Sequence, residues 1–302
     1  MIYDLIIIGA GPAGLTACLY ALRSRLNVLL IDKAMPGGYL GQILELENYP
    51  GFEMISGFEL AERMVKQLEK YAYQFKQFDV EKIEKQNDFW TVINGGEKLI
   101  TKTLIIATGS SPRKLGIEGE AEFVGKGVSY CGVCDAPFFR DKEVVVIGGG
   151  NTALEEAIYL TKFVSKVTIV HRREGLRADK ILEDRARENK KIQFILNAVC
   201  VKISGASIVE QIIIKDVNTG RQQDLKIQGV FVFAGMNPRT EFLNNLLETD
   251  KAGNIISDKN LAASQPGVFV CGDCTDITLR QVITACGQGA IAAYSVNKYL
   301  ES

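Results

Sequence analysis

The sequence has one histidine, no excess of either charge and no long hydrophobic run. Its 35 basic and 36 acidic side chains give a formal net charge of −1, whereas nucleic-acid-binding proteins usually carry a basic excess or stripe. No stretch approaches the roughly 20 apolar residues that span a bilayer, and the N-terminus lacks the features of a signal peptide. We therefore expect a cytoplasmic protein that binds neither nucleic acid nor membrane.

Cysteine is also sparse, with seven residues in a chain of 302. An odd number, thinly spread, does not suit a secreted disulfide scaffold. In a reducing cytoplasm a cysteine pair is more often catalytic or metal-binding than structural. The length is large for one domain, so two domains are expected.

The N-terminus predicts a βαβ unit that binds a dinucleotide. An apolar run at 5–8 leads into a glycine turn, a helix-like stretch from about 15 to 25, and a second apolar run at 28–31 that ends at Asp32. Such glycines let the backbone approach a pyrophosphate, and the helix N-terminus stabilises its charge. The residues assigned to this turn are Gly9, Gly11, Pro12, Ala13 and Gly14.

The same arrangement recurs in the middle of the chain. An apolar run at 144–147 leads into a second glycine turn, a helical pattern and another run at 167–170. Gly9 to Asp32 is 23 positions, and Gly148 to His171 is also 23. The residues assigned to the second turn are Gly148, Gly150, Asn151, Thr152 and Ala153. We therefore predict an α/β fold with two Rossmann-like nucleotide-binding domains.

The two copies differ at the end of their second strand. Asp32 can accept hydrogen bonds from an adenosine ribose, whereas the second copy has His171, Arg172 and Arg173 there, with Arg177 one turn on. Arginines bind a 2′-phosphate that a carboxylate would repel. The second site is therefore expected to select NADPH, and the first to hold a permanently bound redox partner, for which FAD is the obvious candidate.

A two-cysteine motif precedes the second turn. Cys131 and Cys134 are spaced for a disulfide that forms and opens easily, and such motifs lower the pKa of one thiol. Half of a zinc site is the alternative, with Cys271 and Cys274 as the other half. That second pair follows an apolar strand where a ligand-binding turn is expected, so we expect no metal.

These motifs resemble the low-molecular-weight thioredoxin reductases over essentially the whole length. The segments that carry the resemblance are 9–14, 47–51, 107–109, 131–135, 148–153, 171–177, 272–273 and 280–281. The resemblance implies the class II pyridine nucleotide-disulfide oxidoreductase architecture. It places an FAD domain at 1–113 and 243–302, an NADPH domain at 114–242, and two chains in a homodimer.

The resemblance also implies individual roles. The flavin site would include Gly38, Gln42, Asn48, Ala107, Thr108, Gly109, Gly272, Asp273, Arg280, Gln281 and Val282. Electrons would pass from NADPH through FAD to the disulfide, with Cys134 facing the flavin and Cys131 attacking oxidised thioredoxin or a similar small protein. Because the one histidine lies at the NADPH site, Asp135 would be the general acid.

Some residues depart from the family pattern, and rival functions remain. Tyr39 stands where glutamine is common, and Ala136-Pro137 follow Asp135 in place of glycine. A ferredoxin-dependent flavin thioredoxin reductase would tend to lose the second glycine turn and the arginines. A ferredoxin–NADP reductase of this fold would lack the cysteine pair. A non-catalytic nucleotide-binding protein is the alternative from another class. The family resemblance further implies domain rotation, with hinges near 112–114 and 237–240.

Overall fold

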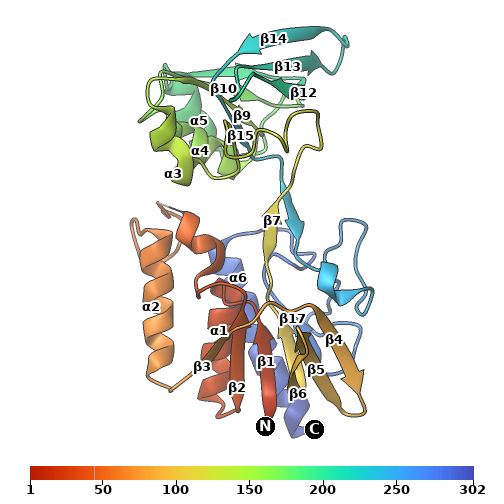
Figure 1. Ribbon diagram of the computed structural model, residues 1–302. Helices are drawn as coiled ribbons and strands as arrows, with labels where there is room; N and C mark the ends of the chain where they lie inside the picture. The colour runs from red at the N-terminus through yellow and green to blue at the C-terminus, as the bar shows by residue number, and fades with distance from the viewer. Residues whose placement is uncertain (44) are drawn as a thin grey trace. The chain divides into compact units, whose positions relative to one another are not determined.

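The computed structural model describes residues 1–43 and 45–302, and the chain divides into two compact units (Figure 1). Unit 1 comprises Met1–Ser111 and Asn237–Ser302, and unit 2 comprises Pro112–Met236. The chain passes from unit 2 back into unit 1 between Met236 and Asn237, six residues before the expected boundary at 242–243. The reason is local, because Arg239 donates its backbone N–H to the Gly109 carbonyl at 3.0 Å, within unit 1.

Unit 1 is built on a mixed sheet in the order β3-β2-β1-β6-β5-β4, with β17 beside β6. Strand β2 pairs in parallel with β1 and β3, and β6 pairs in parallel with β1 and β17, whereas β5 is antiparallel to both β4 and β6. The elements of unit 1 are β1 (Ile2–Ile8), α1 (Pro12–Arg23), β2 (Val28–Asp32), η1 (Gly38–Gln42), α2 (Gly57–Glu69), β3 (Gln74–Gln77), β4 (Lys82–Gln86), β5 (Phe89–Asn94), β6 (Glu97–Ile106), η3 (Glu241–Leu243), β17 (Val268–Val270) and α6 (Val282–Glu301).

Helices α1 and α6 pack closely against each other in unit 1 (Figure 1). A side chain at Gly289 of α6 would lie 2.2 Å from the Ala13 carbonyl oxygen of α1, so only glycine allows this approach. The apolar runs that predicted β1 and β2 are buried in the sheet. The packing therefore fixes the N-terminal end of α1 over the sheet.

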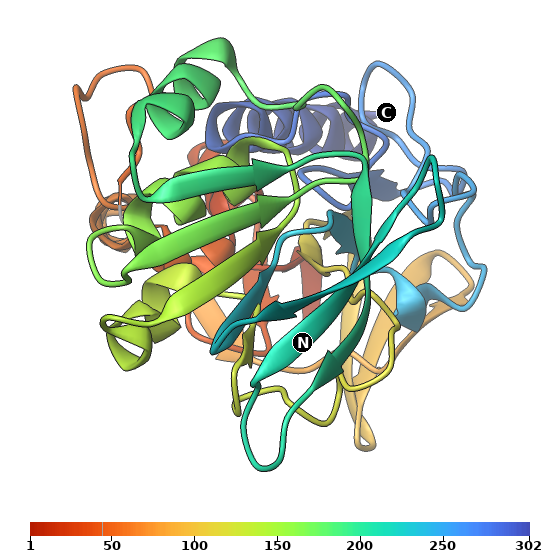
Figure 2. The ribbon, with the colours of Figure 1, turned by 90° about the horizontal axis from the view of Figure 1, so that it is seen from above.

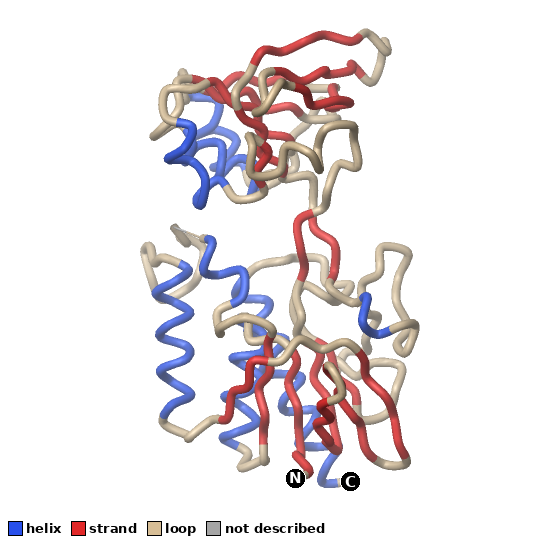
Figure 3. The backbone as a smooth tube through the Cα atoms, viewed as in Figure 1, coloured by secondary structure: helices blue, strands red, loops and turns tan. Residues whose placement is uncertain are grey.

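Unit 2 contains a five-stranded parallel sheet in the order β11-β10-β9-β15-β8 and a three-stranded antiparallel sheet, β12-β13-β14 (Figures 2 and 3). The elements of unit 2 are β8 (Val128–Ser129), α3 (Gly132–Asp135), η2 (Ala136–Phe139), β9 (Glu143–Ile147), α4 (Asn151–Leu160), β10 (Lys166–Val170), α5 (Lys180–Glu188), β11 (Ile192–Ile195), β12 (Ala198–Ser204), β13 (Gln211–Asp216), β14 (Gln222–Lys226) and β15 (Gly229–Val232).

The segments that connect the units pair with each other as β7 (Ser110–Pro112) and β16 (Met236–Pro238). Both expected hinge segments include part of this pair.

The predicted repeat of strand, glycine turn, helix and strand is confirmed in both units. It appears as β1-α1-β2 and as β9-α4-β10, each with parallel strands. Helix α1 begins three residues earlier than the hydrophobic pattern suggested, because Pro12 occupies its first turn, where a missing N–H costs nothing. Among the described residues, no helix combines the length and apolar character that a membrane span requires.

Candidate functional site

The first glycine turn is shaped by close backbone contacts on one side and open space on the other. A Cβ atom at Gly9 would lie 2.2 Å from the Ala107 carbonyl oxygen, and one at Gly14 would lie 1.8 Å from the Gly9 carbonyl oxygen. A Cβ at Gly11 would meet nothing within 4 Å. Gly11 is also the N-cap of α1, and no side chain caps that end. The turn therefore presents open backbone amides where a pyrophosphate would bind.

Asp32, at the end of β2, stabilises this turn by accepting backbone hydrogen bonds. Its Oδ2 accepts a hydrogen bond from the Ala10 N–H at 2.7 Å, and its Oδ1 accepts one from the Ala34 N–H at 2.9 Å. A carboxylate has about four acceptor positions. Asp32 can therefore hold the turn and still accept hydrogen bonds from a ribose.

Two of the other predicted flavin residues meet the glycine turn directly. A Cβ at Gly38 would lie 3.0 Å from Gly11 Cα, and one at Gly272 would lie 3.0 Å from Ala13 Cβ. The Gly272 N–H donates to Gln288 Oε1 at 2.7 Å, which anchors the turn after β17 to α6.

Further predicted flavin residues bond to one another or to their loops. Asn48 Nδ2 donates to Gln281 Oε1 at 3.3 Å, joining residues 233 positions apart. Arg280 Nη2 donates to Asn254 Oδ1 at 2.8 Å. Burial raises the pKa of Asp273, while the Arg280 charge and a hydrogen bond with Ser110 lower it.

The remaining predicted flavin residues lie in loops or at the ends of elements of unit 1. Thr108 Oγ1 donates to the Arg239 carbonyl at 2.7 Å, Ala107 is buried, and Gly109 has φ +66°. Val282 packs against the small apolar cluster around Leu40. Gln42 is exposed at the end of η1.

The second glycine turn repeats the geometry of the first. A Cβ at Gly148 would lie 2.5 Å from the Phe233 carbonyl oxygen, whereas one at Gly150 would meet nothing within 4 Å. No side chain caps α4, which begins after Gly150. His171 is buried against the turn, since a Cβ at Gly149 would lie 2.4 Å from its Nδ1. This turn therefore also fits a dinucleotide.

The arginine-bearing loop is tied to the second turn. The Arg177 N–H donates to the Gly149 carbonyl at 2.6 Å. Asn151 and Asp179 exchange two hydrogen bonds, Nδ2 to Oδ2 at 2.7 Å and backbone N–H to Oδ1 at 2.8 Å. Asn151 thus holds the loop in place in addition to any ligand contact. Of the other residues assigned to the turn, Thr152 is exposed and Ala153 is buried.

The arginine side chains at this loop are available for an anion. Arg172, Arg173 and Arg177 are all exposed, and within residues 1–43 and 45–302 none of them forms an ion pair. Burial lowers the pKa of the neighbouring His171, and the three arginine charges lower it further. The imidazole is therefore neutral at neutral pH, and the positive charge next to the second glycine turn comes from the arginines.

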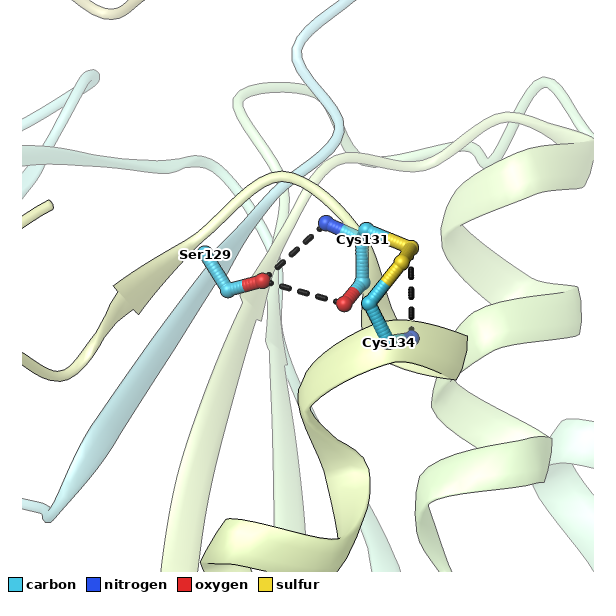
Figure 4. The surroundings of a disulfide bond; sticks show 3 residues. All are labelled: Ser129, Cys131 and Cys134. Carbon is cyan, nitrogen blue, oxygen red and sulfur yellow. Dashed lines mark hydrogen bonds between the residues drawn. A yellow bond between two sulfur atoms is a disulfide. The ribbon is translucent and has the colours of Figure 1, made fainter. Parts of the chain in front are cut away.

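Cys131 and Cys134 form a disulfide in unit 2, with Cα atoms 5.4 Å apart (Figure 4). Ser129 Oγ holds the entry to the motif by accepting from the Cys131 N–H and donating to the Cys131 carbonyl, both at 3.0 Å. Cys131 is the N-cap of α3, and its Sγ accepts from the Cys134 N–H at 3.2 Å. Cys134 is exposed, whereas Cys131 and Asp135 are half-buried.

The second cysteine pair has a different character. Cys271 and Cys274 are fully buried in unit 1 and remain free thiols. Burial raises the pKa of both. Cys131 and Cys134, by contrast, are bonded to each other in unit 2. No cluster of three metal-ligating side chains occurs among the described residues.

Sequence reasoning missed Glu156, whose carboxyl group lies against the cysteine motif. A Cβ at Gly132 would lie 2.1 Å from Glu156 Oε2. The available signal was its helical position, because Glu156 follows the buried Ala153 by three residues and precedes the buried Ala157. An acid on the apolar face of a helix is unusual enough to single out.

Comparison with known proteins agrees with this geometry. The family model described as pyridine nucleotide-disulphide oxidoreductase matches residues 3–289. A thioredoxin reductase from Listeria monocytogenes is 42% identical over 99% of this chain and 94% of its own length. The crystal structure of Lactococcus lactis thioredoxin reductase is 43% identical, covers 99% of both chains and has a TM-score of 0.97. That of T. acidophilum thioredoxin reductase is 34% identical, with a TM-score of 0.95, over 100% of this chain and 99% of its own.

Proposed function

This chain belongs to the pyridine nucleotide-disulphide oxidoreductase family, and we propose that it is a thioredoxin reductase whose working centre is the Cys131–Cys134 disulfide. It uses FAD and NADPH, and its substrate partner is thioredoxin. The observation that carries the proposal is the position of the disulfide, which opens α3 directly before a complete dinucleotide turn in the same unit. The disulfide therefore lies in the same unit as the dinucleotide site that would bind its electron donor.

We assign FAD to unit 1. Its glycine turn has open amides at the start of α1 and a braced carboxylate at the ribose position, Asp32. Gly38 and Gly272 meet that turn, and the Asn48–Gln281 hydrogen bond joins two more of the expected residues. These contacts support one ligand site built from both ends of the chain.

We assign NADPH to unit 2. The exposed guanidinium groups of Arg172, Arg173 and Arg177 suit a 2′-phosphate, and the Asn151–Asp179 pair fixes the loop that carries them. Retention of the turn and the arginines favours this function over the ferredoxin-dependent alternative. The cysteine pair favours it over a ferredoxin–NADP reductase.

When bound, FAD and NADPH supply the two electrons that open the Cys131–Cys134 disulfide. The hydrogen bond from the Cys134 N–H to Cys131 Sγ would stabilise a thiolate at Cys131, consistent with attack by this sulfur on the partner's disulfide. Asp135 follows the second sulfur directly and is our candidate for the general acid.

A coupled assay tests this function. The purified protein should be yellow, oxidise NADPH, and reduce a model disulfide only when thioredoxin is present. With NADH in place of NADPH the rate should fall, because NADH lacks the 2′-phosphate that the arginines would bind. Turnover that does not depend on thioredoxin would contradict the proposed partner, and equal rates with NADH would contradict the assignment of the arginines.

The surroundings of the disulfide support docking of a small protein. Phe138 is 73% exposed, whereas Phe139 is buried against Phe231 with ring centroids 5.0 Å apart. The two adjacent aromatic residues therefore lie in different environments. Phe138 is thus the apolar side chain we assign to contact with thioredoxin.

We also propose a homodimer located in the cytoplasm. Exposed apolar side chains on α6, namely Ile283, Ile291 and Tyr294, suit burial against a second copy. The five cysteines outside the disulfide are free thiols, all of them in the described part of the chain, which suits a reducing compartment.

A further inference from the structure

Glu156 is not part of the redox motif, but its carboxyl group lies against Gly132, which stands between the two cysteines. It belongs to α4, which packs against the short helix α3. A Cβ at Gly132 would lie 2.1 Å from Glu156 Oε2 and 3.2 Å from its Cδ. The carboxyl group therefore fills the space that a side chain between the two cysteines would need, and glycine at 132 is what admits it.

The carboxyl group is buried and incompletely satisfied. Oε2 is inaccessible to solvent and has no hydrogen-bond partner in the part of the chain that the structure describes. Burial raises the pKa of Glu156 to about 7, and the charge of Glu155 adds to this. The backbone amides of Val133 and Gly132 act in the opposite direction. A buried acceptor without a partner is costly when it is ionised.

Several charged groups of the neighbouring elements form ion pairs of their own. Glu183 of α5 pairs with Lys180 and Arg187, and Glu143 at the start of β9 pairs with Lys166 of β10.

Helix α3 brings Asp135 and the two cysteines, and α4 itself brings Glu155. Reduction of the disulfide is thus the event that changes the charge next to Glu156.

We propose that Glu156 is a positioning residue of the redox couple, whose carboxyl group holds a proton while the neighbouring sulfurs carry the charge of the reduced pair. The inference rests on Cys131–Cys134 being the redox pair proposed above. Opening the S–S bond consumes two electrons, which the reductase activity supplies, and leaves two thiolate sulfurs. One proton from solvent goes to one sulfur, and above pH 7 a second proton from solvent goes to the Glu156 carboxylate, so that one thiolate remains. Closure of the disulfide returns both protons to solvent above pH 7, and only the thiol proton below about pH 6, where the carboxyl group stays protonated.

Glu156 thereby links the reducing power of the pair to pH. Above pH 7 a carboxylate beside the sulfurs disfavours a second negative charge there, and protonation relieves this repulsion. Below about pH 6 the carboxyl is neutral and behaves as an amide would.

The test is a redox titration of the pair as a function of pH. Wild-type holoenzyme and Glu156→Gln are equilibrated with dithiothreitol redox buffers from pH 5.5 to 9, quenched in acid, and alkylated to count reduced Cys131 and Cys134. After correction for the two protons that dithiothreitol itself releases on oxidation, the equilibrium constant for reduction of the pair should fall more steeply with pH in the wild type between pH 7 and 8.5, by up to about tenfold more per pH unit. Below pH 6 the two proteins should converge. A merely structural effect would displace the whole curve instead.

Two further variants complete the test. Glu155→Gln should keep the steeper segment but move it to lower pH, because burial still raises the pKa of Glu156 while the added contribution of the Glu155 charge is removed. Glu156→Asp, which keeps a titrating group in a shorter side chain, should also begin its steeper segment at lower pH, and it serves if Glu156→Gln does not fold.

Two results would count against the account in different ways. Superimposable curves for the wild type and the Glu156 variants would overturn this inference alone. A pair that neither dithiothreitol nor NADPH reduces would overturn the proposed function itself.

Discussion

The burial of Glu156 has a consequence for folding that can be measured apart from redox chemistry. The unfolded chain releases this proton near pH 4.5 and the folded chain near pH 7. The stabilising contribution is therefore complete at low pH and is lost as the pH rises through about 7. From the two pKa values the loss is about 3 kcal/mol.

Glu156→Gln should remove this dependence. Denaturant unfolding at pH 4.5, 5.5, 6.5 and 7.5 would give the free energy of unfolding of the wild type and the variant. The difference between them should shift by about 3 kcal/mol in favour of the variant between the lowest and highest pH. A constant difference would mean that Glu156 is already ionised at low pH in the folded protein.

Single residues also mark where sequence reasoning ends. The spacing of Cys131 and Cys134 allowed a disulfide, and the structure contains it. Glu156 could not be found in this way, because its role depends on α4 packing against Gly132, a contact between positions 24 apart. The distinct environments of Phe138 and Phe139 likewise depend on packing against Phe231.

Two glycines of the first turn, Gly9 and Gly11, allow ligand binding and folding to be separated by substitution. Gly9 has φ +109° and a Cβ there would collide with the Ala107 carbonyl oxygen, whereas Gly11 has φ −75° and open space. Gly9→Ala should lower the free energy of unfolding by at least about 2 kcal/mol. Gly11→Ala should leave the free energy of unfolding of the cofactor-free protein unchanged but abolish FAD binding. Flavin absorbance and denaturant unfolding distinguish the two, and equal stability of the two variants without flavin would contradict this assignment.

The loop between β10 and α5 should determine the choice of nicotinamide cofactor. Removal of a charge-assisted hydrogen bond costs about 1.5–3 kcal/mol. Arg172→Ala should therefore raise the KM for NADPH about tenfold or more and leave the KM for NADH nearly unchanged. Steady-state kinetics with both cofactors check this, and a matched rise in both values would point to a disturbed loop instead.

At the level of whole elements the sequence was a good guide because the apolar runs and glycine turns are local signals. The constant offset of 23 residues predicted β1-α1-β2 and β9-α4-β10. The point where the chain returns to unit 1 was harder to predict, because it is fixed by the Arg239 N–H donating to the Gly109 carbonyl, which lies 130 positions away in the sequence. No motif in the sequence predicted the antiparallel sheet β12-β13-β14.

For the molecule as a whole we predict two copies in solution. Sedimentation should give twice the mass of the chain, since α6 exposes Ile283, Ile291 and Tyr294. Ile291→Lys with Tyr294→Lys should shift the population toward the monomer by placing charges in the apolar contact. A wild-type protein that sediments as a monomer at micromolar concentration would contradict the proposed homodimer.

The most direct test of the central claim is to trap thiols in the complete protein. With NADPH and without thioredoxin, an alkylating reagent should label Cys131 and Cys134, and without NADPH it should label neither. Cys271 and Cys274 are fully buried and should stay unlabelled in both cases, which provides an internal control. If oxidised thioredoxin is added to the NADPH-reduced protein before the alkylating reagent, Cys131 and Cys134 should no longer be labelled. Labelling of Cys131 and Cys134 that is the same with and without NADPH would contradict the account.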